Sequence, residues 1–453
     1  MKLLRSIICL VLCALFCVGC AAPEGERMET KLTQYVIRQA EYPVYPAFVN
    51  AEDYFRADGA WDSAAYEQAE KEAAQALQNM GKTGSVDAAA LLTFTDTTAG
   101  RALQSRDGAN GVYSPVSLYV AMAMLAELCD GESRAQVLRA MGAEDLESLR
   151  QEIRQLWLES YCDSGVVTSR MGGSLWLNEQ VAFNEDVLQT LADNYFASSY
   201  RVAMGTEAAD QAIGQWINEQ TDNLLETEAG NIRTKVQTLL QMYSTLYFKA
   251  RWKDTFLPEL TEKGLFHLYD ADGASVECDF MHRESTGACR RGEGYTAAML
   301  PFTAGGGYMT FCLPDSDTNV DALLQSDTLI SELGEMDEYG NIIRWTVPKF
   351  DVSATMGLNE LMKELGAKAV FDAQAADFTT LTEVPAYLDS VRQAARVKID
   401  EEGVEAAAFT EMAICGASLP IGVVETKLDR PFIFAIYDES GLPLFVGTVM
   451  KPE

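Results

Sequence analysis

The sequence is short of the side chains on which most catalytic and metal chemistry depends. Its 453 residues include only two histidines, His267 and His282, which leaves little room for a histidine-rich metal site or a Ser-His-Asp triad. No GxSxG, HExxH or complete Walker motif is present. A carboxylate pair could arise by chance among 67 acidic residues, but none stands out. We therefore expect a protein that is not an enzyme and that needs no metal or cofactor.

Positive charge is also scarce. The chain carries 35 Lys and Arg against 67 Asp and Glu, a formal net charge of −32. Such a surface repels phosphate backbones, so nucleic acid is not expected as a partner. Hydrophobic residues make up 48 % of the chain, which argues against disorder and suffices for a large core.

The apolar run at the N-terminus is too short to span a membrane. Residues 7–19 form 13 uncharged positions, whereas a spanning helix needs about 20. Lys2 and Arg5 precede this run, which is typical of a secretory signal peptide. We assign residues 1–19 to that signal.

The signal ends in Val18-Gly19 and is followed by Cys20, a pattern that resembles a bacterial lipobox. In that motif the cysteine is lipidated and becomes the new N-terminus, although Cys17 stands where leucine is usual. Lipidation of Cys20 would tether the protein to the extracellular face of the bacterial membrane. Plain secretion after cleavage at Ala22 is the alternative, and both place the protein outside the cytoplasm.

The cysteines show neither a CxxC motif nor a metal-ligand spacing. Cys278 and Cys289 flank the turn-like residues 283–287 and could pair across a hairpin. Buried free thiols are the alternative.

We divide the rest of the chain into a lipid-anchored tether and N-terminal extension, residues 20–85, and one mixed domain, residues 86–453. Residues 21–60 show no regular pattern, and their aromatic side chains Tyr42, Tyr45 and Phe48 are candidates for docking. Residues 62–80 predict a helix that begins at Asp62 or Ser63 and stops at Gly81.

Helices and strands are mixed in the large domain. Helices are predicted at 117–128, 147–158 and 355–365, and strands at 173–177, 241–248, 342–350 and 395–399. Two further strands are expected within 294–313, and the chain ends in a hairpin. No shift in composition divides this part.

Residues 401–426 form an unusually apolar connection between two predicted strands. Only Glu405 and Glu411 carry charge between positions 403 and 424. Surface loops are normally polar, and one longer than about 20 residues is usually functional. This segment is the best candidate for a functional site.

The chain resembles a serpin, a serine-protease inhibitor of the suicide-substrate type. The resemblance lies in five ordered motifs: NGVYSPVSLYVAMAML (110–125), LYFKARW (246–252), VPKF (347–350), IDEEGVEAAAFT (399–410) and RPFIFAIYDESGLPLFVGTVMKP (430–452). It implies an α+β fold of about nine helices around three β-sheets, with an exposed reactive-centre loop. It also implies a monomer that traps a serine protease when its cut loop inserts into the main sheet.

The resemblance places the loop's hinge at positions 401–408. Compact side chains are needed there for insertion, and Val404 stands where the family usually has Thr or Ser. The hinge residues are Glu401, Gly403, Val404, Glu405, Ala406, Ala407 and Ala408. The alternative for AAAFTEMA is a short surface helix.

Fourteen positions after Gly403, the family pattern puts the reactive bond between Ala417 and Ser418. The neighbouring bonds Gly416–Ala417 and Cys415–Gly416 are alternatives, because the distance to the next motif is longer than in the family. A small residue before the bond fits elastase-like or subtilisin-like proteases.

The resemblance also implies two sites that control opening of the sheet. The shutter comprises Ser114 and Ser117, with Ser244 and Gln393 standing where the family has Asn and His, so its hydrogen bonds must differ. At the base of the loop stand Trp252 and an ion pair of Lys349 with Glu401. Ordinary packing and solvated charge are the alternatives, and a non-inhibitory serpin that serves as a surface binding scaffold is the alternative for the whole chain.

Overall fold

A computed structural model describes residues 32–84, 86–104, 108–269, 273–404 and 422–452. Tyr35–Glu453 form one compact unit; of the other unit, Met1–Gln34, only the 3-10 turn Leu32–Gln34 is described. The described helices are α2 (Ser63–Met80), α3 (Ala89–Leu103), α4 (Pro115–Leu128), α5 (Gly131–Met141), α6 (Leu146–Ser160), α7 (Glu185–Tyr195), α8 (Glu207–Gln220), α9 (Glu226–Gly230), α10 (Val320–Leu323), α11 (Leu329–Gly334) and α12 (Asn359–Glu364).

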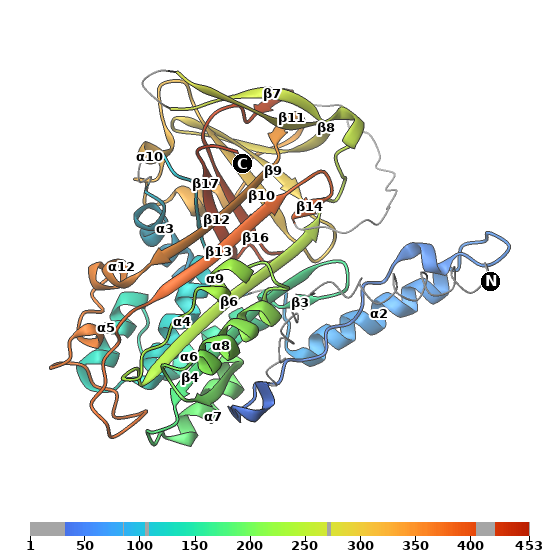
Figure 1. Ribbon diagram of the computed structural model, residues 1–453. Helices are drawn as coiled ribbons and strands as arrows, with labels where there is room; N and C mark the ends of the chain where they lie inside the picture. Colours follow the sequence, from blue (N-terminus) through green and yellow to red (C-terminus); the bar gives the residue numbers. More distant parts are fainter. Residues whose placement is uncertain (1–31, 85, 105–107, 270–272, 405–421, 453) are drawn as a thin grey trace, which may run out of the picture. The chain divides into compact units, whose positions relative to one another are not determined.

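The main sheet has the strand order β1-β5-β4-β6-β14-β13-β12, and β3 pairs with β4. Strands β6 and β13 run alongside each other, and the very short β14 lies at one end of them (Figure 1). The bounds are β1 (Val36–Arg38), β3 (Cys162–Asp163), β4 (Thr168–Asn178), β5 (Ala197–Val202), β6 (Leu240–Arg251), β12 (Phe350–Gly357), β13 (Arg392–Ile399) and β14 (Gly403–Val404).

The second sheet has the order β15-β11-β8-β9-β10-β16-β17-β2, and β7 pairs with β8. Its bounds are β2 (Gly111–Tyr113), β7 (Glu262–His267), β8 (Ser275–Gly292), β9 (Tyr295–Pro301), β10 (Tyr308–Pro314), β11 (Glu338–Pro348), β15 (Val423–Lys427), β16 (Phe432–Tyr437) and β17 (Pro443–Val449). The terminal hairpin and the strands expected within 294–313 are therefore confirmed.

The α+β class is confirmed, with eleven α-helices in the described residues where about nine were expected. The expected strands join into two hydrogen-bonded sheets rather than three. The joining strand is β8, because its 18 residues pair with β7, with β11 and with β9 in turn.

Helix α4 forms the centre of the core. All 14 of its residues are buried, and the helix contacts both β6 of the main sheet and β17 of the second sheet. A helix that is apolar on every side needs such a position. The helix begins at Pro115, two residues before the predicted start. It begins there because the Ser114 side chain caps it by accepting a hydrogen bond from the Ser117 N–H, and because proline suits the first helical position.

Helix α2 shows the termini that the sequence predicted. The Asp62 side chain accepts a hydrogen bond from the Ala65 N–H, and Gly81 adopts the left-handed conformation with φ of 94°. Helix termini of this kind depend on local residues alone.

The N-terminal extension is more ordered than predicted. Residues 36–38 form β1, which adds to the edge of the main sheet by pairing Val36 with Tyr200 of β5. Tyr42 then packs its ring against Trp157, Tyr161 and Phe196, with ring centroids 5.2 to 6.3 Å apart. The predicted docking of this segment through aromatic side chains is confirmed, but its lack of regular structure is not.

Two local predictions were wrong. Residues 283–287 form no turn, since β8 runs straight through them, so Cys278 and Cys289 lie 11 positions apart on one strand. At about 3.3 Å per residue they are far beyond disulfide reach, and both thiols are free. The helix expected at 355–365 starts later, at Asn359, because β12 continues to Gly357 against β13.

No helix among the described residues is long and apolar enough to cross a bilayer. Within the same residues, no cluster of three or more potential metal ligands is found.

Candidate functional site

The site begins where β14 lies between β6 and β13. Gly403 and Val404 pair with Arg251 and Ala250 of β6, and Val404 also pairs with Ile399 of β13. Beyond Val404, β6 and β13 share no register pair in the described part of the chain. The main sheet is therefore split along most of these two strands, and we call the split between β6 and β13 the slot.

A cavity of about 490 Å³ occupies the far end of the slot. Its walls are residues 240–245 of β6 and residues 392–394 of β13, and its floor includes Leu118, Ala121 and Leu125 of α4. The floor is apolar and both walls carry open strand edges. A segment of extended chain with small inward side chains is the kind of occupant that this shape accepts.

The base of the loop is anchored by Trp252. Its side chain is only 1 % exposed and stacks on Phe302 with ring centroids 4.9 Å apart. The indole Nε1–H donates to the Asp400 carbonyl, and the Trp252 N–H donates to the Glu402 carbonyl, each over 2.9 Å. The Asp400 carboxylate in turn accepts the N–H groups of Glu402 and Gly403. The turn that leads into β14 is therefore held from both sides.

The ion pair implied by the resemblance is present beside this turn. Lys349 Nζ lies 3.0 Å from Glu401 Oε2, and the Thr261 hydroxyl donates to Glu401 Oε1 over 2.8 Å. Burial opposes ionisation of Glu401, but hydrogen bonds from Lys349, from its own backbone and from Thr261 outweigh it and lower the pKa of the carboxyl. Glu401 is thus charged at neutral pH.

Gly403 fits the slot only because it has no side chain. A Cβ at this position would lie 2.2 Å from the Ala250 carbonyl oxygen. The next residue, Val404, is 3 % exposed and belongs to the hydrophobic core. The entrance of the slot therefore already contains the first two hinge residues.

The shutter residues are brought together only in part. Gln393 Oε1 accepts from the Ser114 N–H, and Gln393 Nε2 donates to the Ser114 carbonyl, both over 2.8 Å. Ser117 and Ser244 line the cavity with Gln393, but the Ser117 hydroxyl is buried without a hydrogen-bond partner among the described residues. The amide of Gln393 thus bonds the start of α4 by itself.

Several predicted site residues lie outside the described residues. These are Cys20, Glu405, Ala406, Ala407, Ala408, Ala417 and Ser418.

Sequence reasoning missed three residues at the base of the loop. Asp400 lies inside the IDEEG motif, so the sequence could have identified it as a residue at the base of the loop. Its carboxylate accepts the Glu402 N–H in the turn before β14. The Phe256 N–H donates to the Glu401 carbonyl, and Thr261 bonds its side chain. Neither of these two carries a signal in the sequence, because chain folding alone brings them to Glu401.

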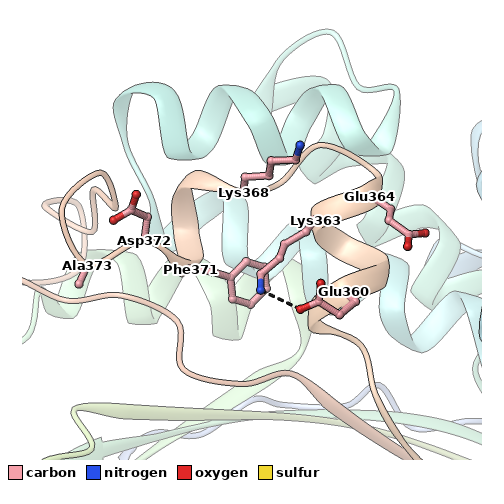
Figure 2. A pocket seen from close by; sticks show the side chains of 7 residues that line it. All are labelled: Glu360, Lys363, Glu364, Lys368, Phe371, Asp372 and Ala373. Atoms are coloured by element: carbon pink, nitrogen blue, oxygen red, sulfur yellow. Dashed lines mark hydrogen bonds and ion pairs between the residues drawn. The ribbon is translucent and has the colours of Figure 1, made fainter.

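A second depression lies over α12 and the segment that follows it (Figure 2). Lys363 Nζ donates to Glu360 over 2.8 Å and lies 5.4 Å from the centre of the Phe371 ring. None of its seven lining residues is a predicted site residue. It adds nothing to the site in the slot.

Comparison with known proteins identifies the architecture. A family profile described as Serpin (serine protease inhibitor) matches residues 90–452. Serpin-ZXA of Oryza sativa subsp. japonica is 28 % identical over 363 residues, covering 76 % of this chain and 91 % of that protein.

Two solved structures share the fold. The native state of the thermophilic serpin tengpin has a TM-score of 0.72 at 24 % identity, covering 81 % of this chain and 95 % of that one. Thyroxine-binding globulin in complex with thyroxine has a TM-score of 0.69 at 21 % identity, covering 80 % of this chain and 99 % of that one.

Proposed function

Since the chain belongs to the serpin family, whose members are in general protease inhibitors rather than catalysts, we propose that it is a suicide-substrate inhibitor of serine proteases. The observation that carries the proposal is the slot, whose two long strand edges are bridged, among the described residues, by Gly403 and Val404 alone. Because Gly403 and Val404 already pair at the entrance of the slot, insertion of the loop would need no rearrangement of these two hinge residues.

The pairs at the base define a register for the inserted strand. Continued past Val404, the register with Gly403 opposite Arg251 and Val404 opposite Ala250 would put residue 408 opposite Leu246 and residue 410 opposite Ser244. On the other side, the pair of Val404 with Ile399 would put residue 410 opposite Gln393. On β13, Gln393, Ala395 and Val397, which would lie opposite even-numbered loop residues, are buried, whereas Arg392 and Lys398 are exposed. Even-numbered loop residues therefore face the core in this register.

The reaction starts when the protease serine attacks the carbonyl of Ala417. The Ala417–Ser418 amide bond breaks, and the Ala417 carbonyl forms an ester with the protease serine. The proton of the serine hydroxyl passes to the nitrogen of Ser418, which becomes a new N-terminal amine. Insertion of the freed strand then carries the ester-linked protease along the inhibitor. Residues 405–411 lie between two strands and gain on the order of ten ladder hydrogen bonds at about 1 kcal/mol each, on the order of 10 kcal/mol. The intact protein is therefore held by a kinetic barrier.

The proposed target is a protease with a small apolar primary pocket. Ala417 precedes the bond, and no Lys or Arg lies between positions 403 and 425. Elastase-like and subtilisin-like enzymes accept such a residue, whereas a trypsin-like enzyme requires a base. We further propose that Cys20 carries the lipid that anchors the protein, as a monomer, outside the cytoplasm.

Incubation with pancreatic elastase followed by a denaturing gel tests the proposal. A covalent complex at the sum of the two masses, lost when the protease serine is blocked beforehand, is the expected result. Cleavage without any complex would point to the alternative, a non-inhibitory serpin that binds other molecules, and would overturn the inhibitory function. Mass mapping of the released fragment identifies the cut bond.

A matched pair of hinge variants tests the mechanism. Ala408→Gln puts an amide on the face of the inserted strand that packs on Leu246 and Ala395, both core residues. Ala407→Gln puts the same side chain on the other face of the strand, opposite buried Tyr247 of β6 and partly exposed Arg396 of β13. We expect the first variant to become mainly a substrate and the second to keep inhibiting. Equal behaviour of the two variants would contradict insertion in this register.

A further inference from the structure

Two cations on the slot's wall have no ionic partner in the described residues. The solvent-facing row of β13 consists of Arg392, Ala394, Arg396 and Lys398, and their inward neighbours are buried. Arg396 is paired with Asp351 of β12 over 2.6 Å. Arg392 and Lys398 are exposed, and neither takes part in an ion pair within the described part of the chain.

Across the entrance of the slot stands a third such cation, Lys249 of β6. It precedes Ala250, the partner of Val404, and so faces away from the core. Like the two on β13, it has no ion pair among the residues that the structure describes.

The register set by β14 relates these cations to the sequence of the loop. Val404 opposite Ile399 puts position 405 opposite Lys398 and position 411 opposite Arg392. The hydrogen bond from the Asp400 N–H to the Gly403 carbonyl belongs to the same register. On the β6 side, position 405 falls opposite Lys249.

The loop's charges match this row position by position. Its only acids up to position 424 are Glu405 and Glu411. The neutral residues Ala407 and Phe409 fall opposite Arg396, which is already paired, and opposite Ala394. Slippage by one residue would turn both acids toward the apolar side of the sheet, where an unpaired charge is costly.

We propose that Arg392 and Lys398 are positioning residues that set the register of the inserting strand by pairing with its two acidic residues. The occupant of the slot is residues 405–411 of this chain, which lie outside the described residues. Lys398 and Lys249 receive Glu405 together as insertion starts, and Arg392 receives Glu411 as it reaches the cavity. The proposal rests on the proposed function and adds to it a charge requirement.

Charge reversal and charge exchange test the proposal on the full-length protein. The measured quantity is the rise in unfolding temperature that follows nicking of the loop by elastase. Because the rise compares the nicked and intact forms of the same variant, any effect of the substitution that is common to both forms cancels. Arg392→Glu should reduce this rise by about 2–4 °C and should increase substrate turnover per complex formed about fivefold. Adding Glu411→Arg to Arg392→Glu should restore both, and 1 M salt should shrink the difference.

Arg201→Glu is the matched control. Arg201 is an exposed base on β5 of the same sheet, two strands away from the slot, and its reversal should leave the rise unchanged. If Arg392→Glu behaves like this control, or if Glu411→Arg fails to rescue it, the charge proposal is overturned while insertion stands. If nicking does not raise the unfolding temperature of the unmodified protein, the proposed function and the charge proposal fall together.

Discussion

Gln393 bonds both backbone groups of Ser114, accepting from its N–H and donating to its carbonyl over 2.8 Å each. Ser114 caps α4, the helix that underlies the slot. One side chain of β13 therefore ties a wall of the slot to its floor.

Replacing Gln393 by leucine should weaken the intact protein. The change leaves the Ser114 N–H buried without its partner and removes one of the two hydrogen bonds to the Ser114 carbonyl, which still accepts from the Leu118 N–H. We expect a cost of about 2 kcal/mol in the free energy of unfolding. Urea unfolding followed by far-ultraviolet circular dichroism measures it. Gln189→Leu is the control, because Gln189 is exposed on α7 and its side chain donates to Asp193. Equal urea midpoints for the two variants would show that the double hydrogen bond contributes nothing.

Gly403→Ala should force the hinge out of the slot. Its Cβ would meet the Ala250 carbonyl oxygen at 2.2 Å, so the pairs with β6 must break and Val404 must become exposed. We expect a loss of about 2 kcal/mol and faster amide exchange at Trp252, whose N–H donates to Glu402. Gly357→Ala is the matched control, because nothing lies within 4 Å of its Cβ position. Unchanged exchange at Trp252 would contradict the close approach.

Tyr42→Ala should release the N-terminal extension from the main domain. The ring contacts three aromatic residues, and its truncation should cost about 3 kcal/mol. Limited proteolysis should then cut residues 35–50 much faster. Val44→Ala in the same segment should have no such effect, since Val44 is 89 % exposed. A rate for Tyr42→Ala no higher than that for Val44→Ala would argue that the extension is held by β1 alone.

Asp438 should make stability fall as the pH rises. Burial raises the pKa of its carboxyl from 3.8 to about 7, although the N–H groups of Leu442 and Ser440 donate to it. Because the folded state keeps the proton and the unfolded state loses it, this stabilisation is complete below about pH 4 and disappears as the pH rises through 7. The difference in unfolding free energy between the wild type and Asp438→Asn should therefore change by about 3 kcal/mol between pH 4 and 8. A difference that is constant with pH would refute the raised pKa.

Elements defined by neighbouring residues were predictable, and elements defined by distant partners were not. Asp62 and Gly81 mark the ends of α2 because both act within one turn of the helix. Residues 283–287 look like a turn, yet their partners on β11, from Asn341 to Trp345, keep them extended. Likewise, the three residues of β1 form a strand only because β5 is beside them.

The site was predictable in its residues but not in its geometry. The motifs identified Trp252, Lys349 and Glu401, and the wider resemblance to the family identified Gln393. The structure gives each of these residues a partner. The departure at Gln393 predicted a changed network, but not that a single amide would span both groups of Ser114. The split between β6 and β13 depends on pairing between strands far apart in the sequence, which no local pattern reports.

The pairing of β1 with β5 attaches the N-terminal segment to one side of the slot, while β12 and β13 lie on the other. Widening the sheet by a strand should therefore move exposed Val44 away from exposed Ser353 of β12 by about one interstrand spacing, ~4.8 Å. The distance between these two positions therefore reports the width of the main sheet. A pair of fluorophores attached there would follow insertion of a strand in real time.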